Sequence, residues 1–356
     1  MTPLHAFRTD PIDPDQSQAL DAVLRARCAP GGPALLRMGL GATEGLLFGR
    51  YQPIAKSAWG RPDVQRRITG GRLVPVGPGI LEVSVAAPGL TDLTIQQRPI
   101  TSDLILNRYV RGVLRGLERL RLNVMYPGRD LITLEKRAVG HVAFDIDEAG
   151  RPLVQFHLAW STSLAEAAPR LADSGWRLED RDDLLAPEGC ITLSEALGAT
   201  PKLERVLEAL REGFAEHVGA TIPIEPLPEE MRAQADSAFA ETFAQEAWRA
   251  DRTPPASLDR TARVPSQLGS FHVALALEDD SRLGQVYLMG EFLADWPAVA
   301  ALEEALPGCL PEWSSIAKVV DRVLDTPPHV VLGLGPRRTI PDTIVRAIGQ
   351  RHLPSS

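Results

Sequence analysis

The sequence predicts an α+β protein, in which a mixed, largely antiparallel sheet flanked by helices is followed by a smaller α+β domain. Three observations support this prediction. Short alternating apolar segments punctuated by Gly and Pro are typical of strands and turns. Residues 102–122 carry apolar side chains at helical spacing. The strand and helix pattern restarts at Ser270 after a polar stretch that contains prolines.

The composition describes a chain that can bury a large core. Its 356 residues are 44% hydrophobic and 24% charged, which is ordinary for a globular protein. The 38 basic and 46 acidic residues give a net charge of -8, so we expect no nucleic-acid partner. We expect neither a signal peptide nor a membrane-spanning segment, and we predict a cytoplasmic protein.

The three cysteines of the chain are far apart. Cys28, Cys190 and Cys309 are odd in number and widely spaced, which favours neither a disulfide framework nor a zinc site. A reactive thiol needs an electropositive pocket, and none of the three lies in the motifs described below. We therefore expect no metal site built from cysteine, and the three thiols are poor candidates for a nucleophile.

The first half of the chain alternates strands with one short helix and one long helix. Residues 13–18 offer helix-capping side chains, and the Gly-Gly-Pro at 31–33 ends the short helix. In the long helix the arginines form a face opposite the apolar one, which indicates core packing. The predicted elements are a helix over 19–28, strands over 34–38 and 46–48, an alternating strand at the end of 65–85, and a helix over 102–122.

A hairpin and a third helix complete the first domain, which we expect to cover residues 1–250. The turn at 147–150 separates predicted strands over 141–145 and 153–160. Pro201 suits the first turn of a helix that we expect to run to His217.

A second unit is expected after a linker at 251–265, which is polar and contains prolines. The accessory domain is predicted over 266–330. Its predicted elements are strands over 271–277 and 283–289 and helices over 298–306 and 314–324. Residues 331–356 are treated as a carboxy-terminal extension, with a short strand and a short helix but no assigned role.

The chemistry-bearing motif lies in the segment 65–85. It comprises Arg66, Arg67, Gly70, Gly71 and Arg72. Glycines let the backbone approach a ligand closely, and the amides of such a turn can form a concavity that binds anions. Guanidinium groups add bidentate contacts to a phosphate or a carboxylate. The local sequence alone favours a plain hairpin, because short glycine motifs recur by chance.

In its context this motif resembles the Arg-Arg-x-Ser-Gly-Gly-Gly-Ala-Val-Tyr/Phe-His-Asp core of the lipoate-protein ligase A family. Further matches follow in the order that the family shows, and together they cover about residues 15–325. Gly49-Arg50-Tyr51-Gln52 resembles Gly-Arg-x-Gln, Gly128-Arg129-Asp130-Leu131 resembles Gly-Arg-Asn-Asp-Leu, Gly140 matches the glycine of a Lys-hydrophobic-Ser-Gly turn, and Phe156-His157 stands at the His-His-Gly-Thr position. The small second domain also resembles that of the two-domain bacterial enzymes.

The resemblance implies a biotin/lipoate ligase-like fold and a defined chemistry. Such enzymes use ATP and Mg²⁺ to form an acyl-adenylate from lipoate or a related short acyl acid. They then transfer the acyl group, held in a hydrophobic tunnel, to a lysine of a lipoyl carrier domain of the E2 or H-protein type. The position of the catalytic lysine holds Arg137, with Lys136 beside it. The other implied site residues, at the substrate and nucleotide, are Arg50, Arg66, Arg67, Gly70, Gly71, Arg72, Asp130, Gly140, His141 and His157.

Departures from the family pattern leave two other functions open. Arg72 stands at the third-glycine position, and Pro75 removes a backbone donor. Lys136 and Arg137 are neighbours on a predicted strand, so their side chains point to opposite faces, and both are also typical of a solvated turn. These changes fit a catalytically lapsed homologue that binds or regulates lipoylated carriers. An octanoyltransferase of the same fold is the third possibility, and it would require one of the cysteines as nucleophile.

Overall fold

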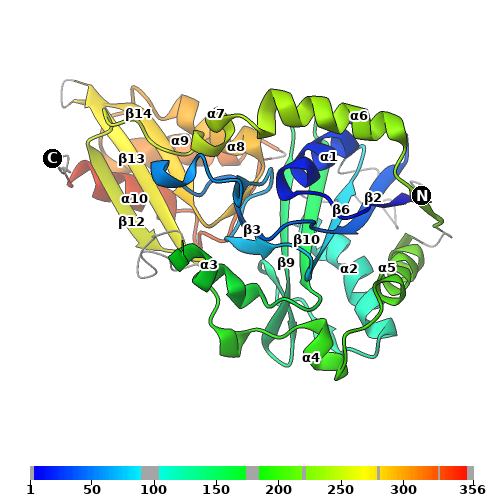
Figure 1. Cartoon of the computed structure of the whole chain (residues 1–356). Helices are drawn as coiled ribbons and strands as arrows, with labels where there is room; N and C mark the ends of the chain where they lie inside the picture. Colours follow the sequence, from blue (N-terminus) through cyan, green and yellow to red (C-terminus); the bar gives the residue numbers. More distant parts are fainter. Residues whose placement is uncertain are drawn as a thin grey trace.

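An eight-stranded mixed sheet forms the centre of the amino-terminal part of the molecule (Figure 1). This computed structural model describes residues 4–89, 104–173, 184–218, 222–278, 281–327 and 329–350. The strand order is β11 (Ile224–Pro226), β1 (Leu4–Arg8), β2 (Ala34–Leu40), β6 (Ile80–Ala86), β10 (Pro152–Ala159), β9 (Arg137–Ile146), β8 (Leu131–Leu134) and β7 (Val124–Met125). Strand β1 pairs in parallel with β2 and β11, and the other pairs are antiparallel. The predicted α+β class with a mixed, largely antiparallel sheet is confirmed.

Helices cover both faces of this sheet. Helices α1 (Pro14–Arg27) and α6 (Glu229–Ala238) lie together on one face, and α2 (Ile105–Arg119) and α5 (Leu203–Val218) lie together on the other (Figure 1). The largest apolar core lies between the sheet and the α2–α5 pair. The face under α1 is different, because several of its buried side chains are polar.

Glycines allow α2 and α5 to approach each other closely. A Cβ atom added at Gly213 would lie 2.3 Å from the backbone nitrogen of Gly116, and one added at Gly112 would lie 2.3 Å from the ring of Phe214. The two helices therefore touch almost backbone to backbone, a spacing that larger residues would not permit.

A small three-stranded sheet holds the glycine motif. Strand β3 (Gly45–Phe48) lies between β4 (Val64–Arg66), which is parallel to it, and β5 (Val74–Val76), which is antiparallel. The turn between β4 and β5 contains the double glycine. Short segments then join the two sheets to the rest: η1 (Lys56–Ala58), η3 (Leu164–Glu166), α3 (Ala167–Asp173), η5 (Pro187–Gly189), α4 (Leu193–Leu197), the π-helical η6 (Phe239–Phe243) and α7 (Glu246–Ala250).

The carboxy-terminal part has its own sheet and core. The sheet consists of β12 (Arg260–Pro265), β13 (Ser270–Glu278) and β14 (Arg282–Gly290). Its helices are α8 (Trp296–Ala305), α9 (Trp313–Leu324) and α10 (Thr339–Ile348), and a two-stranded sheet pairs β15 (Leu293–Ala294) with β16 (Val331–Leu332). Tyr51 of the amino-terminal part also belongs to this core, where its ring stacks on Phe292 at 4.5 Å.

The ends of this unit differ from the predicted boundaries. The predicted linker, residues 251–265, contains β12, which pairs with β13. The predicted extension, residues 331–356, contains β16 and α10, and the apolar face of α10 is buried in the same core as the strands. We therefore propose that the second domain covers about residues 260–350. Helix α10 has only ten residues, so its apolar face alone did not show in the sequence that it belongs to the second domain.

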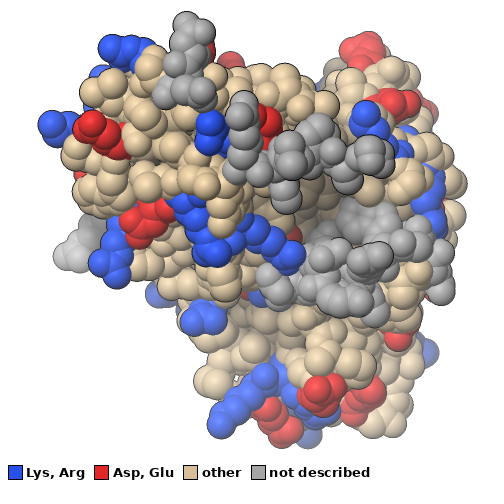
Figure 2. Space-filling model, turned by 90° about the vertical axis from the view of Figure 1, so that its left-hand side faces the viewer, with Lys and Arg blue, Asp and Glu red and all other residues tan. Residues whose placement is uncertain are grey.

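The surface carries charges of both signs. Figure 2 shows the side of the molecule formed by the carboxy-terminal sheet, where acidic and basic side chains are intermixed. Among the described residues no helix combines the length and the apolar character needed to cross a bilayer.

Replacing Gly213 by alanine tests the helix contact. We expect Gly213→Ala to lower the free energy of unfolding by about 1–3 kcal/mol, because the new methyl group collides with the backbone of α2. Urea denaturation measures this loss. The matched control is Gly60→Ala, since Gly60 is exposed with no atom within 4 Å of an added Cβ. Equal stability of the two variants would contradict the described packing.

Candidate functional site

The double-glycine turn is packed against the carboxy-terminal domain. Gly71 has a φ of +87°, which favours glycine, and its N–H donates a hydrogen bond to the carbonyl oxygen of Phe292 at 2.7 Å. A Cβ added at Gly70 would lie 2.4 Å from that same oxygen. The side chain of Leu293 lies over Gly71. An amide that sequence analysis assigned to an anion is thus bonded to protein backbone.

Arg66 and Arg67 hold the loops around this turn. Both side chains are fully buried. The Arg66 guanidinium donates to the carbonyl oxygens of Gly49, Arg50, Gln52, Trp248 and Arg249, and Arg67 donates to those of Leu47, Gly70 and Arg72. Burial, followed by the charge of Arg50, lowers the pKa of Arg66 to about 9. The two arginines fix the backbone of the motif, and their predicted contact with phosphate stays a prediction.

Arg72 and Asp130 form a buried ion pair. The Arg72 Nε lies 2.5 Å from Asp130 Oδ2, and Nη2 lies 3.1 Å from Oδ1. Both side chains are at most 9% exposed. The side chain at the third-glycine position therefore binds the aspartate that the resemblance placed near the nucleotide. Neither carboxylate oxygen is available to a magnesium ion unless this pair opens.

His141 and His157 lie side by side below the turn. Their ring centroids are 5.7 Å apart, and both are buried. Among the described residues, neither ring nitrogen of His141 and not the Nδ1 of His157 has a hydrogen-bond partner. Burial, with the nearby charges of Arg67 and Arg72, holds the pKa of His141 well below its usual range, so the ring is neutral at pH 7. Burial likewise lowers the pKa of His157.

Lys136 lies in the hairpin turn that joins β8 to β9, and Arg137 is the first residue of β9. Glu135 and Lys136 have φ values of 49° and 68°, and Lys136 is exposed. The Arg137 side chain is 42% exposed and lies 3.8 Å from Glu135. Arg137 precedes His141 by four residues, about 13 Å along an extended strand. The structure does not bring this pair to the glycine turn, so their catalytic role stays a prediction that requires the hairpin to move.

Gly140 and Arg50, the remaining predicted residues, make packing contacts within the protein. A Cβ at Gly140 would lie 2.6 Å from the Leu158 side chain, so this glycine allows two strands to pack closely. The Arg50 guanidinium lies between the rings of Trp248 and Trp296, at 4.3 and 4.5 Å from their centroids. It also lies 2.9 Å from Asp251. This stack joins α7 to α8 rather than lining the glycine turn.

Sequence analysis missed the contribution of the carboxy-terminal domain. Phe292, Leu293 and Trp296 contact the amino-terminal part, where the Trp296 N–H donates to Asp145 at 2.9 Å. Asp145 lies on β9, and Arg25 binds its other oxygen at 2.5 Å. No local pattern signals these contacts, because they join residues some 150–220 positions apart.

The cysteines do not provide a nucleophile at this site. Burial raises the pKa of Cys28 to about 11 and raises that of Cys190. Both thiols are therefore protonated at neutral pH, in the state that reacts poorly. Cys309 lies at the end of the α8 segment in the second domain, away from the glycine motif. The geometry gives no support to cysteine-based acyl transfer.

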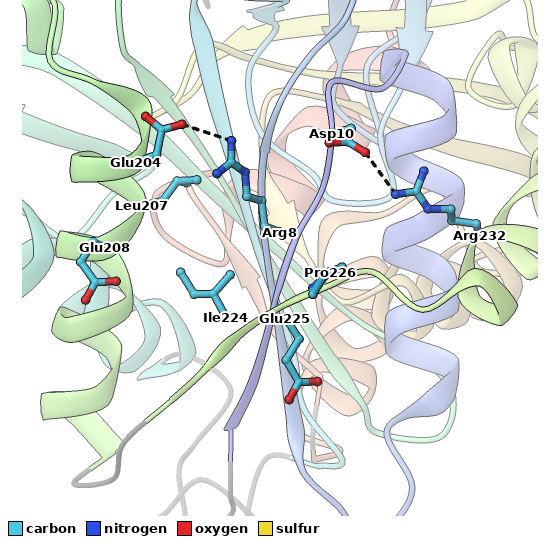
Figure 3. Close-up of a pocket in the computed structure, with 9 residues that line it drawn as sticks. All are labelled: Arg8, Asp10, Glu204, Leu207, Glu208, Ile224, Glu225, Pro226 and Arg232. Atoms are coloured by element: carbon cyan, nitrogen blue, oxygen red, sulfur yellow. Dashed lines mark hydrogen bonds and ion pairs between the residues drawn. The ribbon is translucent and has the colours of Figure 1, made fainter.

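A cavity of about 510 Å³ is lined by Arg50 and Ile68, but neither Gly70 nor Gly71 lines it. Another of about 410 Å³ lies between β1, β11, α5 and α6, with Leu207 and Ile224 as its apolar part (Figure 3). Its two arginines are paired, Arg8 with Glu204 at 3.4 Å and Arg232 with Asp10 at 3.3 Å (Figure 3). No predicted site residue lines it. Within the described ranges, no group of three or more His, Cys, Asp or Glu residues is arranged to hold a metal ion.

Several solved structures resemble this chain. No protein-family model matches the sequence, and no curated protein matches it. The chain is similar to LipL1 of P. falciparum, solved in complex with lipoate. That match has a TM-score of 0.69 at 11% identity and covers 96% of this chain and 99% of LipL1.

Two further matches each cover 71% of this chain. A bi-partite lipoate protein ligase of Thermoplasma acidophilum, described with its E2 lipoyl domain, is 16% identical with a TM-score of 0.56, over 71% of this chain and 98% of its own. A lipoate-protein ligase A bound with ATP is also 16% identical, with a TM-score of 0.53, over 71% and 100%. The chain therefore has the fold of lipoate-protein ligases, as the sequence motifs predicted.

Breaking the buried ion pair should be costly. Replacing Arg72 by methionine leaves the Asp130 carboxylate buried without this partner, and we expect the free energy of unfolding to fall by about 3–5 kcal/mol. Urea denaturation provides the value. The control Arg137→Met removes an exposed pair and should change stability by about 0–1 kcal/mol. A small loss in both variants would show that Arg72 and Asp130 are solvated.

A buried neutral histidine makes stability depend on pH. The folded pKa of His141 is lowered, so below about pH 6.5 the unfolded state binds a proton that the folded state does not, and stability falls with pH. Between pH 6.5 and 5 the free energy of unfolding of the wild type falls because of this histidine. We expect the fall in His141→Leu to be smaller by about 2 kcal/mol. Unfolding free energies at both pH values test this, with His5→Gln as the control for removal of an exposed histidine. An unchanged slope in His141→Leu would refute the buried neutral ring.

Proposed function

We propose that the chain is an ATP-dependent ligase that attaches lipoate or a related short acyl acid to a lysine of a lipoyl-type carrier domain. One observation carries this proposal. Arg67, Arg72 and His141 surround the double-glycine turn in a protein whose fold matches lipoate-protein ligases along most of its length. Two guanidinium groups at a glycine turn supply the positive charge that a phosphate and a carboxylate need.

The proposed chemistry has two displacement steps. A carboxylate oxygen of the acid attacks the α-phosphorus of ATP, and pyrophosphate leaves. The unprotonated ε-amine of the carrier lysine then attacks the acyl carbon, and AMP leaves. Negative charge grows on the phosphate in the first step, and we propose that Arg67 and Arg72, which lie at the turn, offset it. Magnesium is proposed only as the usual partner of ATP.

Substrate binding in this proposal requires an exchange of partners. The Gly71 N–H is bonded to the Phe292 carbonyl, and Arg72 is bonded to Asp130. A phosphate can take the place of both oxygen partners, because it accepts hydrogen bonds from amides and from guanidinium groups alike. In the described conformation, protein oxygens accept the hydrogen bonds that this proposal assigns to phosphate oxygens.

A catalytically lapsed binding protein is the second candidate. The observation in its favour is the exposed hairpin, where Lys136 and Arg137 offer no cation to the turn in this conformation. Arginine at the lysine position also differs as a donor, since its flat fork is not a compact ammonium. Such a protein would recognise a lipoyl carrier without activating an acid. The carrier is proposed by analogy with the Thermoplasma acidophilum ligase and its E2 lipoyl domain.

Incubation with ATP labelled at the α-phosphate separates these candidates. With lipoate, octanoate or biotin, the ligase proposal expects a labelled acyl-adenylate. We expect Arg72→Met to reduce its formation by about 10²-fold or more, because one charged donor at the phosphate is lost. Lys56→Met, a change at an exposed residue on η1, is the matched control and should retain wild-type formation.

The negative outcome is also informative. If none of the three acids gives an adenylate, the ligase proposal fails. Calorimetry with ATP then tests the second candidate, because sub-millimolar nucleotide binding would contradict a protein that has lost its nucleotide site.

A further inference from the structure

A row of polar side chains crosses the large sheet directly below the glycine turn. His141 of β9 pairs in register with His157 of β10, and His157 pairs with Glu82 of β6. Directly opposed residues on neighbouring strands have Cβ atoms about 5 Å apart, so the three side chains form one continuous strip. The strip begins at the turn, since a Cβ at Gly71 would lie 3.2 Å from the Nε2 of His141.

Helix α1 and the glycine motif extend this polar layer. The Gln155 amide on β10 donates to Gln18 at 2.9 Å and to Asp21 at 2.6 Å. The Thr69 hydroxyl, next to the double glycine, donates to Gln155 at 2.6 Å. Movement of the turn is therefore coupled by direct hydrogen bonds to the layer beneath it.

Several polar atoms of this layer have no hydrogen-bond partner. Within the described part of the chain they are Gln18 Nε2, Glu82 Oε1, His141 Nδ1 and Nε2, and His157 Nδ1. All four residues are at most 3% exposed. A neutral imidazole offers one donor and one acceptor, a carboxylate oxygen accepts, and an amide nitrogen donates. Such groups are rarely left unsatisfied in a folded protein, so their concentration below one turn requires an explanation.

The apolar core does not share this feature. The side chains that alternate with the row, such as Val83, Val142 and Phe156, point to the opposite face and pack under α2 and α5. The face of the sheet that lies beside the glycine turn is thus the polar one, and its side chains are buried. The hydrophobic tunnel that the resemblance implied for an acyl tail is not what lies directly beneath Gly71.

We propose that the acid bound at the glycine turn carries hydrogen-bonding groups in its tail, such as an amide or a ureido group, and that these groups bind His141, His157, Glu82 and Gln18. The inference rests on the proposed function, since it needs a carboxylic acid at the turn. A ureido group has two N–H donors and one carbonyl acceptor. Glu82 Oε1 accepts from the donors, and Gln18 Nε2 donates to the carbonyl.

The apolar side chains on the same face of the sheet form a separate cluster. Ile80, Ala159 and Leu164 form a small apolar cluster with Ala138 and Cys190, next to the strip. The members of this cluster pack on one another, and none of their side chains is among the described ones with an unpartnered buried polar atom. A plain alkyl chain on the polar strip would leave its five atoms unsatisfied, which disfavours such a ligand.

Calorimetry on the full chain, with and without ATP, tests this inference with acids of matched length. The probes are octanoic acid and octanedioic acid monoamide, which places an amide at the end of a similar chain. We expect the monoamide to bind at least about tenfold more tightly, because a site built for hydrogen bonds rejects an analogue that lacks them. In His141→Leu we expect this preference to disappear, with a melting temperature equal to or above that of the wild type, since no described hydrogen bond is lost.

Control and contrary results are distinct. His217→Leu, on α5, removes a histidine outside this layer and should keep the preference for the monoamide. Equal affinity, or tighter binding of octanoic acid, would overturn the inference but leave the proposed ligase function standing. If neither acid binds at millimolar concentration, with or without ATP, the proposed function fails and the inference fails with it.

Discussion

The buried guanidinium group of Arg67 is the constraint on which the site depends. It donates to the carbonyl oxygens of Leu47, Gly70 and Arg72, and so ties β3 to both ends of the double-glycine turn. Hydrogen bonds to a charged donor are stronger than neutral ones, and a buried charge demands them. Arg67 therefore sets the shape of the turn. Its guanidinium group also places a positive charge there.

This constraint connects the two domains. Because the turn is fixed, the Gly71 N–H is presented to the Phe292 carbonyl, and the stacked rings of Tyr51 and Phe292 hold that segment in place. Protein oxygen atoms thus accept hydrogen bonds from the donors proposed for a phosphate.

The sequence allowed much of the fold to be predicted, because amphipathic helices and alternating strands are local signals. The long helix, the hairpin around 147–150 and the second strand–helix unit are all confirmed. The site was harder to predict. Motif order drew attention to Arg67, Gly71 and Asp130, whose roles stay predictions, but partners such as Phe292 come from more than 200 residues away and leave no local pattern. The turn position of Lys136, with its positive φ, agrees with the solvated turn that the sequence also allowed.

Hydrogen exchange at the Gly71 amide tests the central claim, that the turn is closed by backbone of the second domain, most directly. The account predicts strong protection of this amide in the free protein, because its hydrogen bond to Phe292 is buried. It also predicts altered protection when ATP and an acyl acid are added together. Exchange at the rate of an open loop in the free protein would contradict the account.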